Sequence, residues 1–352
     1  MKNSLTEHTT HLESGNNLSS DQVEVAANLL TDESVPVSEK TNFLKSLAQK
    51  GETDEEFSSF VSSFRSFAIS PKLDDFSTRA IDLCGTGGDR SGSFNISTVV
   101  SMIVAAGGVP VIKHGNRSIS SKCGSADLLE ALGIPLLTDD TFLNASLEHL
   151  NFCFLFAPHF HPAFKCLAPV RKSLAQEGVI TLFNRLGPCL NPASPSYQIV
   201  GVYNPSYLEQ IAHSLEMNGS KSGWVVHGII DKPSSCGMDE LTACGTNLVR
   251  PYGTIGTGEI KTYSSEYWGQ QTFATEDLRG GSLKDNLSIL DSVISGGGPK
   301  GLRASIVINA ASAFWISGSV SSIIDGVNKA DQIIESGTLS KWLTRAQDFF
   351  AK

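Results

Sequence analysis

The stretch DLCGTGGDRSGSFNIST, residues 82–98, places glycines, carboxylates and hydroxyl groups directly after a short apolar run. Glycines let a backbone approach a ligand closely, and backbone N–H groups at a turn or a helix start can surround an anion. We therefore expect a phosphorylated ligand at this loop. The stretch lacks the lysine of G-x-x-x-x-G-K-[ST] and the third glycine of G-x-G-x-x-G, so neither nucleotide fingerprint applies. The alternative is a glycine-rich turn with a structural role alone.

A second polar cluster lies in VIKHGNRSISSKCGSADLLEALG, residues 111–133, after another apolar run. Its basic and amide groups follow the run, and its hydroxyl groups lead into a helix expected near Ala126. Such groups bind phosphate and ribose. The alternative is ordinary surface charge, which suits Arg117 better than Lys113, because Lys113 lies between apolar residues and glycines. The members of the cluster are Lys113, His114, Asn116, Arg117, Ser120, Ser121 and Ser125.

An acidic pair, Asp239 and Glu240, stands in GMDELT after the apolar run GWVVHG. Carboxylate oxygens are hard ligands that suit Mg²⁺, and Mg²⁺ neutralises the charge of a leaving diphosphate. Next to a ligand that carries several phosphoryl charges, the pair predicts a magnesium site. Taken alone, adjacent carboxylates more often form a solvated loop.

These clusters need a scaffold that brings them together, and the pattern from Ala80 onward predicts one. Short apolar runs such as AIDLCG, VPVIKHG, NFCFLFA and YQIVGVY alternate with helical patterns such as STVVSMIVAAGG. This alternation indicates an α/β fold with a mostly parallel central sheet flanked by helices. Sheets of this kind bind ligands at the carboxyl ends of their strands, where the first two clusters lie. The segment GPKGLRASIVINAASAFWISGS is expected to form a buried C-terminal helix.

The N-terminal part is helical in pattern. TDEEFSSFVSSF begins with a capping box, Thr53 and Glu56, and EKTNFLKSLAQKG has the same apolar spacing and ends at Gly51. The chain is therefore expected to divide into a polar, flexible extension over 1–21, a helical domain over 22–72 that helices from about 160–195 complete, and a ligand-binding α/β domain over 80–352.

Composition limits the possible functions. With 40% apolar and 18% charged residues and no apolar run of transmembrane length, the chain is expected to be a soluble globular protein without a membrane role. A net charge of −9 disfavours sequence-independent binding to nucleic acid. The seven cysteines are scattered and form no C-x-x-C pair, which argues against a disulfide framework or a zinc site. A reducing cytoplasm is the expected location.

Taken in order, the motifs resemble those of the anthranilate phosphoribosyltransferases of tryptophan biosynthesis. GTGGD with FNIST, KHGNR with GSAD, PVRKSL, LFNRLGPCLNPA and MDEL carry the resemblance, which spans the chain from about residue 22 to the C-terminal helix. It implies a small helical domain joined to a large α/β domain, phosphoribosyl diphosphate (PRPP) in the cleft with a pair of Mg²⁺ ions, and a homodimer. The implied reaction transfers the 5-phosphoribosyl group of PRPP to the amino group of anthranilate, giving N-(5-phosphoribosyl)anthranilate and diphosphate.

The resemblance also assigns roles to residues that match the family's motifs. The positions that match PRPP contacts are Gly85, Gly88, Asp89, Ser93, Asn95, Ser97, Thr98, Lys113, Ser121 and Ser125. Those that match the anthranilate site and its approach route are Gly85, His114, Asn116, His161, Arg171, Gly187 and Pro188. Those that match magnesium ligands are Ser97, Asp239 and Glu240.

We expect no nucleophilic side chain and no strong general base. An aromatic amine is unprotonated at neutral pH, and the ribose anomeric carbon reacts through an oxocarbenium-like state. Catalysis is then expected to depend on placing the amine and on stabilising the departing diphosphate. We assign Lys113, together with the metal, to the leaving group and Arg171 to the carboxylate of anthranilate.

Two segments depart from the family pattern. The first, 174–181, is longer than expected and has Ile180 where arginine is frequent, which bears on the approach of anthranilate. The second, 228–238, is a longer loop before the acidic pair. His159 and His161 have the spacing of metal ligands on a strand, but no third His or Cys completes a site, so His161 is expected to be a pocket wall.

Three alternative functions fit the sequence less well. A pyrimidine nucleoside phosphorylase shares the architecture and binds ribose phosphate, but its serine, glycine and lysine signature is not found. A non-catalytic relative that binds nucleic acid needs a basic groove. An NAD-dependent oxidoreductase needs the missing glycine spacing.

Overall fold

The computed structural model describes residues 4–89, 91–117, 122–136, 139–230, 237–256 and 258–351. Over these residues a seven-stranded sheet has the order β3-β2-β1-β4-β5-β6-β7. The pairs among β1 to β5 are parallel, whereas β6 pairs with β5 and β7 in the antiparallel direction. The predicted mostly parallel sheet is confirmed. The bounds are β1 Ile81–Gly85, β2 Val111–Gly115, β3 Phe152–Phe156, β4 Tyr197–Gly201, β5 Ser222–Ile229, β6 Thr246–Gly253 and β7 Lys261–Tyr263.

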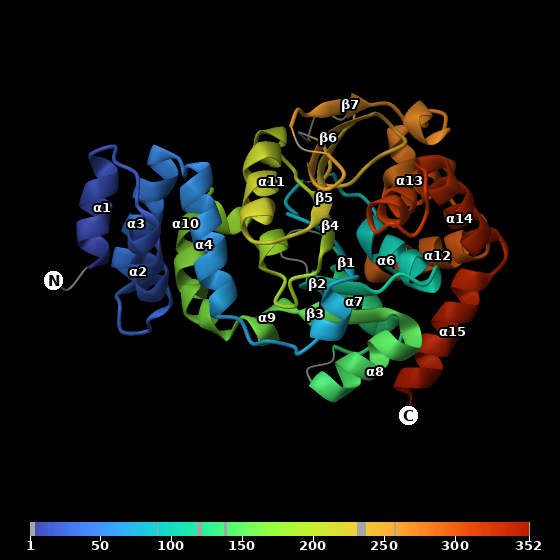
Figure 1. Ribbon diagram of the computed structural model, residues 1–352, viewed down its shortest axis with the longest axis horizontal. Coiled ribbons are helices and arrows are strands. Elements are labelled where there is room, and N and C mark those ends of the chain that lie inside the picture. Colours follow the sequence, from blue (N-terminus) through green and yellow to red (C-terminus); the bar gives the residue numbers. More distant parts are fainter. Residues whose placement is uncertain are drawn as a thin grey trace.

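Helices cover both faces of the sheet (Figure 1). Alternate residues of a strand point to opposite faces, so Ile199 packs with α6 and α13 while Val200 packs with α11. The predicted α/β class with flanking helices is confirmed. The α-helices are α1 Leu5–Glu13, α2 Ser20–Thr31, α3 Val37–Lys50, α4 Asp54–Ser66, α5 Asp74–Ser77, α6 Ile96–Ala106, α7 Ser125–Ala131, α8 Asp140–Leu150, α9 Ala157–Phe160, α10 Ala168–Gln176, α11 Leu208–Met217, α12 Leu283–Ile294, α13 Lys300–Ile316, α14 Ile323–Glu335 and α15 Thr338–Phe350. The 3₁₀ helices are η1 Pro162–Leu167, η2 Leu182–Asn184, η3 Gly187–Leu190, η4 Pro205–Tyr207, η5 Ser265–Trp268 and η6 Thr275–Leu278.

The N-terminal helices gather at one end of the molecule, away from the sheet (Figure 1). Glu56 N donates to Thr53 Oγ1 at 3.1 Å and Thr53 N donates to Glu56 Oε2 at 2.8 Å, so the predicted capping box is present at the start of α4. Apolar residues of η1, α10 and η2 share one core with α2, α3 and α4. The segment around 160–195 thus packs on these helices.

Residues 5–13 form a helix rather than the flexible extension that we expected over 1–21. Among the described residues, α1 begins with a capping box of Ser4 and Glu7 and buries Leu5 and Leu12. It packs on α3. The prediction was wrong because polar residues dominate this stretch, although Leu5 and Leu12 stand seven positions apart, on one face of a helix.

The predicted buried helix near the C-terminus is α13, which packs against α6 and α14. Its side chains are buried almost all round, which explains its continuous apolar pattern. Two further helices, α14 and α15, follow it. Met217 ends α11 and is 68% exposed.

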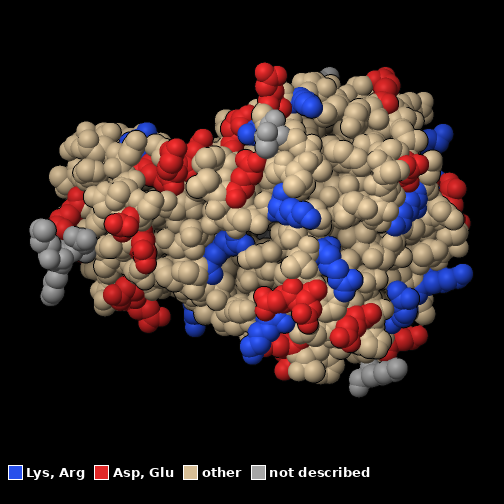
Figure 2. All heavy atoms as spheres, viewed as in Figure 1, with Lys and Arg blue, Asp and Glu red and all other residues tan. Residues whose placement is uncertain are grey.

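The surface carries charges of both signs. On the face drawn in Figure 2, Lys and Arg lie among Asp and Glu rather than in a continuous basic stripe. None of the helices in the described part of the chain is both long and apolar enough to cross a membrane.

Candidate active site

The acidic pair Asp239 and Glu240 lies against the first glycine loop, although the pair and the loop are far apart in the sequence. Gly87 N donates to Asp239 Oδ2 at 2.7 Å, and Ser97 N donates to Glu240 Oε1 at 3.1 Å. Ser97 belongs to the first turn of α6, whose N–H groups have no partner within the helix and whose dipole favours negative charge. The first and third clusters of the sequence therefore form one site at the carboxyl ends of β1 and β4.

Two glycines at strand ends make this close approach possible. Gly85 ends β1 and Gly201 ends β4, and they face each other across the two strands. A Cβ atom would lie 2.2 Å from Asp239 Oδ2 at Gly85 and 1.6 Å from Asp239 O at Gly201. A larger residue at either position would displace the acidic pair. Gly85 thus packs against a carboxylate in addition to any contact with a ligand.

Lys113 lies on β2 and is only 1% exposed. Its Nζ donates to Leu83 O and, at 3.3 Å, to Ser97 Oγ. Its positive charge opposes the rise in the pKa of Glu240. The buried ammonium group therefore affects the site through its hydrogen bond to Ser97 and through its charge near Glu240.

The carboxylates of the acidic pair are difficult to ionise in the free protein. Burial, followed by the charges of Asp89 and Glu240, raises the pKa of Asp239 well above its usual value. Burial also raises the pKa of Glu240 to about 7, against the influence of Lys113. A divalent cation beside the pair would favour the ionised forms, so these oxygens fit Mg²⁺.

Further oxygen ligands would have to come from a bound molecule. Within the described ranges, no group of three or more His, Cys, Asp or Glu side chains is placed to hold a metal ion. Mg²⁺ is commonly bound by one or two carboxylates together with the phosphates of a substrate. The donor set is consistent with that arrangement.

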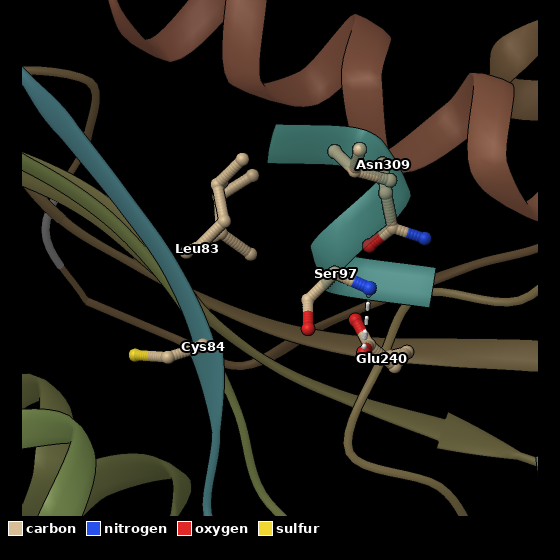
Figure 3. Close-up of a pocket in the computed structure, with 7 residues that line it drawn as sticks. Leu83, Cys84, Ser97, Glu240 and Asn309 are labelled. Atoms are coloured by element: carbon tan, nitrogen blue, oxygen red, sulfur yellow. Dashed lines mark hydrogen bonds between the residues drawn. The ribbon is translucent and has the colours of Figure 1, made fainter. Parts of the chain in front are cut away.

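A small cavity lies beside Glu240, between β1, α6 and α13 (Figure 3). Its volume of about 10 Å³ leaves room for one water molecule at most. The hydroxyl of Ser97 and the carboxylate of Glu240 close one side of it (Figure 3). The lining residues are Leu83, Cys84, Ser97, Val100, Ile199, Glu240 and Asn309.

The loop that precedes α6 is held by its own polar groups. Gly87 and Gly88 have positive φ angles of 66° and 77°, as a tight glycine turn requires. Asp89 Oδ1 accepts from Ser91 N at 3.1 Å, and Ser91 Oγ donates to Ser93 Oγ at 2.8 Å. The hydroxyls and the Asp89 carboxylate therefore gather at the turn.

Asn95 connects the first loop to the second cluster. Its Nδ2 donates to Cys123 O at 3.1 Å, and its Oδ1 accepts from Asn286 Nδ2 of α12 at 2.9 Å. Thr98 is fully buried, and its Oγ1 makes no hydrogen bond with the residues that the structure describes. Both residues are thus placed to shape the start of α6.

The second cluster is partly assembled at the end of β2. A Cβ atom at Gly115 would lie 3.9 Å from Ser125 Cβ, so the end of the strand meets the start of α7. Asn116 is exposed. Arg117 forms ion pairs with Asp127 and Glu130 of α7, each at 2.6 Å. Arg117 is therefore a surface charge that pairs with α7, which was the alternative to a role in ligand binding. Ser120 and Ser121 lie outside the described residues.

His114 and His161 lie side by side, with ring centroids 5.2 Å apart. Burial, followed by the neighbouring His161, lowers the pKa of His114 to about 3. Burial lowers the pKa of His161 to about 4, and its Nε2 is 2.9 Å from Leu190 O. A carbonyl oxygen can only accept, so neutral His161 carries its proton on Nε2. The two neighbouring rings are therefore uncharged at neutral pH.

Arg171 lies on α10 and is exposed. Its guanidinium carbon is 6.0 Å from the ring centroid of Phe183, and it makes no hydrogen bond or ion pair with the residues that the structure describes. Gly187, at the start of η3, is also exposed, and a Cβ atom there would meet nothing within 4 Å. Pro188 is buried, and its carbonyl accepts from Gln198 Nε2 at 3.2 Å.

Comparison with known proteins identifies the family. Residues 77–339 match the profile of the glycosyl transferase family, a/b domain. The chain is 39% identical to the anthranilate phosphoribosyltransferase of Petrotoga mobilis over 95% of this chain and 94% of that protein. It belongs to the anthranilate phosphoribosyltransferase family.

Solved structures agree with this membership. The crystal structure of the Thermus thermophilus anthranilate phosphoribosyltransferase has a TM-score of 0.86 at 33% identity, over 98% of this chain and 99% of that one. The Saccharomyces cerevisiae enzyme in complex with PRPP and Mg has a TM-score of 0.82 at 26% identity, over 99% and 98% of the two chains.

Two buried residues that connect the strands near the site, Asp82 and Asn191, were not predicted from the sequence. Asp82 of β1 is fully buried; its Oδ2 accepts from Asn191 Nδ2 at 2.9 Å and its Oδ1 from His114 N at 3.2 Å. Asn191 also donates to Ile112 O at 2.8 Å. These bonds tie the segment after η3 to β1 and β2. An acidic residue inside the apolar run AIDLCG was the available signal, because a buried carboxylate requires partners.

Proposed function

We propose that this protein transfers the 5-phosphoribosyl group of PRPP to the amino group of anthranilate, giving N-(5-phosphoribosyl)anthranilate and diphosphate, in tryptophan biosynthesis. One observation carries the proposal: the glycine loop, the start of α6 and the pair Asp239 and Glu240 meet at the carboxyl ends of β1 and β4. Backbone donors and carboxylates at one point suit a diphosphate that is bound with a divalent cation.

The phosphate contacts are assigned to the first loop and to the start of α7. Backbone N–H groups of the glycine turn and of the first turn of α6 bind phosphoryl oxygens, and the hydroxyls of the loop orient them. Lys113 positions Ser97 and supplies positive charge from behind it. The proposed set is Gly85, Gly88, Asp89, Ser93, Asn95, Ser97, Thr98, Lys113, Ser125 and, outside the described residues, Ser121.

The metal ligands are assigned to Ser97, Asp239 and Glu240, which would hold a pair of Mg²⁺ ions together with PRPP. When bound, Mg²⁺ neutralises negative charge on the departing diphosphate. The yeast relative in complex with PRPP and Mg supports the binding of Mg together with PRPP.

Anthranilate is assigned to the side of the site formed by His114, His161 and η3. The exposed guanidinium of Arg171 binds the carboxylate of anthranilate, and the neutral rings of His114 and His161 form an apolar wall. The yeast relative in complex with 4-fluoroanthranilate supports an anthranilate site in this fold. The proposed set is Gly85, His114, Asn116, His161, Arg171, Gly187 and Pro188.

No side chain is needed as a nucleophile or strong base, because the aromatic amine is already unprotonated. The protein acts by orienting the amine toward the anomeric carbon and by stabilising charge on the leaving group. Both effects come from groups that are in place before the reaction.

We further propose a helical domain that comprises α1 to α4 and is completed by the segment 160–195, and an α/β domain over 80–352. The expected start of the helical domain at residue 22 was wrong, because α1 packs on α3 and α2 begins at Ser20. The exposed outer helices of the first domain are proposed to form a homodimer in the cytoplasm. The shared core of α2, α3, α4 and α10 supports the first unit.

The deciding experiment mixes the purified protein with PRPP, Mg²⁺ and anthranilate and follows the loss of anthranilate fluorescence. Turnover that requires both PRPP and Mg²⁺ is the expected result. A folded protein without turnover, but with a mobility shift of random DNA, would favour a non-catalytic nucleic-acid-binding relative. Cleavage of a nucleoside that depends on orthophosphate, without consumption of anthranilate, would favour a nucleoside phosphorylase.

A further inference from the structure

The buried helix α13 carries polar side chains that the proposed mechanism does not use. Ser305, Asn309 and Ser312 are all buried, and a buried polar group is costly unless it has a partner. Ser312 Oγ accepts from Trp268 Nε1 at 3.0 Å, inside the core. Ser305 and Asn309 point instead toward the segment that follows the acidic pair.

Asn309 binds both backbone groups of a single residue. Its Oδ1 accepts from Leu241 N at 3.2 Å, and its Nδ2 donates to Leu241 O at 2.7 Å. Nδ2 also donates to Ser305 O at 2.7 Å, within α13. Asn309 is 3% exposed. A side-chain amide bonded to an N–H and a C=O of the same residue fixes both the position and the orientation of that residue.

The next two residues are held in a similar way. Thr242 N donates to Asn247 Oδ1 at 2.7 Å, and Asn247 Nδ2 donates to Thr242 O at 2.9 Å. Ala243 N donates to Ser305 Oγ at 3.0 Å. This buried stretch is neither helix nor strand, so side chains must satisfy its backbone groups. The result is a rigid anchor directly after Glu240.

The acidic pair is also held on its other side. Met238 N donates to Gly228 O at 2.8 Å, and Gly228 N donates to Met238 O at 2.9 Å, which ties Met238 to β5. Asp239 and Glu240 are therefore the span between two fixed residues, Met238 and Leu241. Figure 3 shows Asn309 reaching from its helix toward the side of the cavity where Ser97 and Glu240 lie.

We propose that Asn309 is a positioning residue for the metal carboxylates. By binding both backbone groups of Leu241, it fixes the direction in which the side chains of Asp239 and Glu240 point from the backbone. Their carboxylate oxygens then face the metal ion beside the diphosphate. This inference rests on the proposed function, because it takes the acidic pair as ligands of Mg²⁺ bound with PRPP. It assigns α13 a role in metal binding, although that helix contributes no ligand.

The test compares Asn309→Leu with Ser312→Ala. Leucine has a similar volume and no hydrogen-bonding groups, and Ser312→Ala removes a buried hydrogen bond of the same helix that does not touch the acidic loop. Binding of PRPP is measured by calorimetry over a series of Mg²⁺ concentrations. The KM for anthranilate is measured by initial-rate kinetics at saturating PRPP and Mg²⁺.

For Asn309→Leu the Mg²⁺ concentration that half-saturates PRPP binding should rise about tenfold, as is usual when a supporting partner of a metal ligand is lost. The KM for anthranilate should stay unchanged. Ser312→Ala should lower the free energy of unfolding without changing the dependence on Mg²⁺. A folded Asn309→Leu variant with the wild-type dependence on Mg²⁺ would overturn the proposal.

A measurement on the unaltered protein covers the case in which Asn309→Leu fails to fold. Hydrogen exchange of a peptide that contains Leu241 and Thr242 should be slow in the free protein and should change little when Mg²⁺ and PRPP are added. Fast exchange that slows only with the ligand would show that Asn309 does not hold the loop in advance. If the unaltered protein binds no PRPP with Mg²⁺, the proposed function fails instead, and slow exchange in the free protein would still show the anchor.

Discussion

Asp239 and Glu240 accept from backbone N–H groups, and a Cβ atom added at Gly85 or Gly201 would collide with Asp239. By contrast, Arg171 bonds to none of the described residues, and a Cβ atom at Gly187 would meet nothing within 4 Å. We call the first region the phosphate side (residues 85–98, 113 and 239–241) and the second the amine side (residues 161–191). The phosphate side is built from strand ends and one helix start. The amine side is built from α10 and short 3₁₀ helices.

The difference follows from what each side is proposed to do. A site that stabilises developing charge works best when its dipoles and carboxylates are fixed beforehand, because reorienting them during the reaction costs free energy. A site for a flat, weakly charged amine needs an apolar wall and one cation that can reach the carboxylate. Preorganisation is therefore expected to matter most on the phosphate side.

Removing the charges of the acidic pair should have the largest effect. Asp239→Asn together with Glu240→Gln should slow turnover about a thousandfold, which is about 4 kcal/mol of transition-state stabilisation. The free energy of unfolding at pH 8 should stay equal or increase, because burial and mutual repulsion disfavour the ionised carboxylates in the folded protein. Steady-state kinetics and urea unfolding measure the two quantities. Loss of stability in parallel with activity would contradict a functional role of the charges.

The glycines allow a direct comparison of the two sides. Gly201→Ala should lower the free energy of unfolding by about 3 kcal/mol, because its Cβ would lie 1.6 Å from Asp239 O. Gly187→Ala on the amine side has open space around it and should change stability by less than about 0.5 kcal/mol. Urea unfolding measures both. Equal effects of the two substitutions would contradict the difference in packing between the two sides.

The sequence predicted much of the phosphate side. The motifs around Gly85, Lys113 and Asp239 follow apolar runs, and parallel strands bring their carboxyl ends to one edge, so local pattern alone indicates a shared site. What it could not give is the direction of each side chain. Lys113 is buried behind Ser97, and Arg117 pairs with α7, because these positions depend on packing between distant segments.

The supporting residues were harder to predict for the same reason. Asn309 appears in a continuous apolar helix pattern, and only the fold shows that Leu241 passes beside it. Asp82 and Asn191 are 109 positions apart in the chain, and nothing local to either one indicates that they bond. The helix α1 was missed although its apolar spacing was present, since its mean composition is polar.

Arg171 tests the amine side. Arg171→Ala should raise the KM for anthranilate roughly thirtyfold, because a hydrogen bond between charged groups contributes about 2 kcal/mol. The Kd for PRPP and the stability should not change, since Arg171 bonds to none of the described residues. Initial-rate kinetics at saturating PRPP measure the effect. Lys172→Ala, an exposed neighbour on the same helix, is the matched control and should leave the KM unchanged. An Arg171→Ala variant with the wild-type KM would remove Arg171 from the site.

The smallest expected effect is the contribution of the buried His161 ring to the loss of stability at low pH. In the unfolded chain its pKa is the ordinary 6.5, whereas in the folded protein burial lowers it to about 4. Between these values the unfolded state binds a proton that the folded state excludes, so the contribution to stability is complete above pH 6.5 and is lost as the pH falls toward 4.

We therefore expect His161→Gln to lose about 1–2 kcal/mol less stability than the unaltered protein when the pH is lowered from about 7.5 to 5, as measured by urea unfolding. Glutamine keeps a donor for Leu190 O but does not titrate, so it separates the proton from the hydrogen bond. The comparison at the higher pH, where the ring is neutral in both states, is the control for the loss of contacts. If both proteins lose the same free energy on acidification, His161 is not the buried neutral group that forms the amine-side wall.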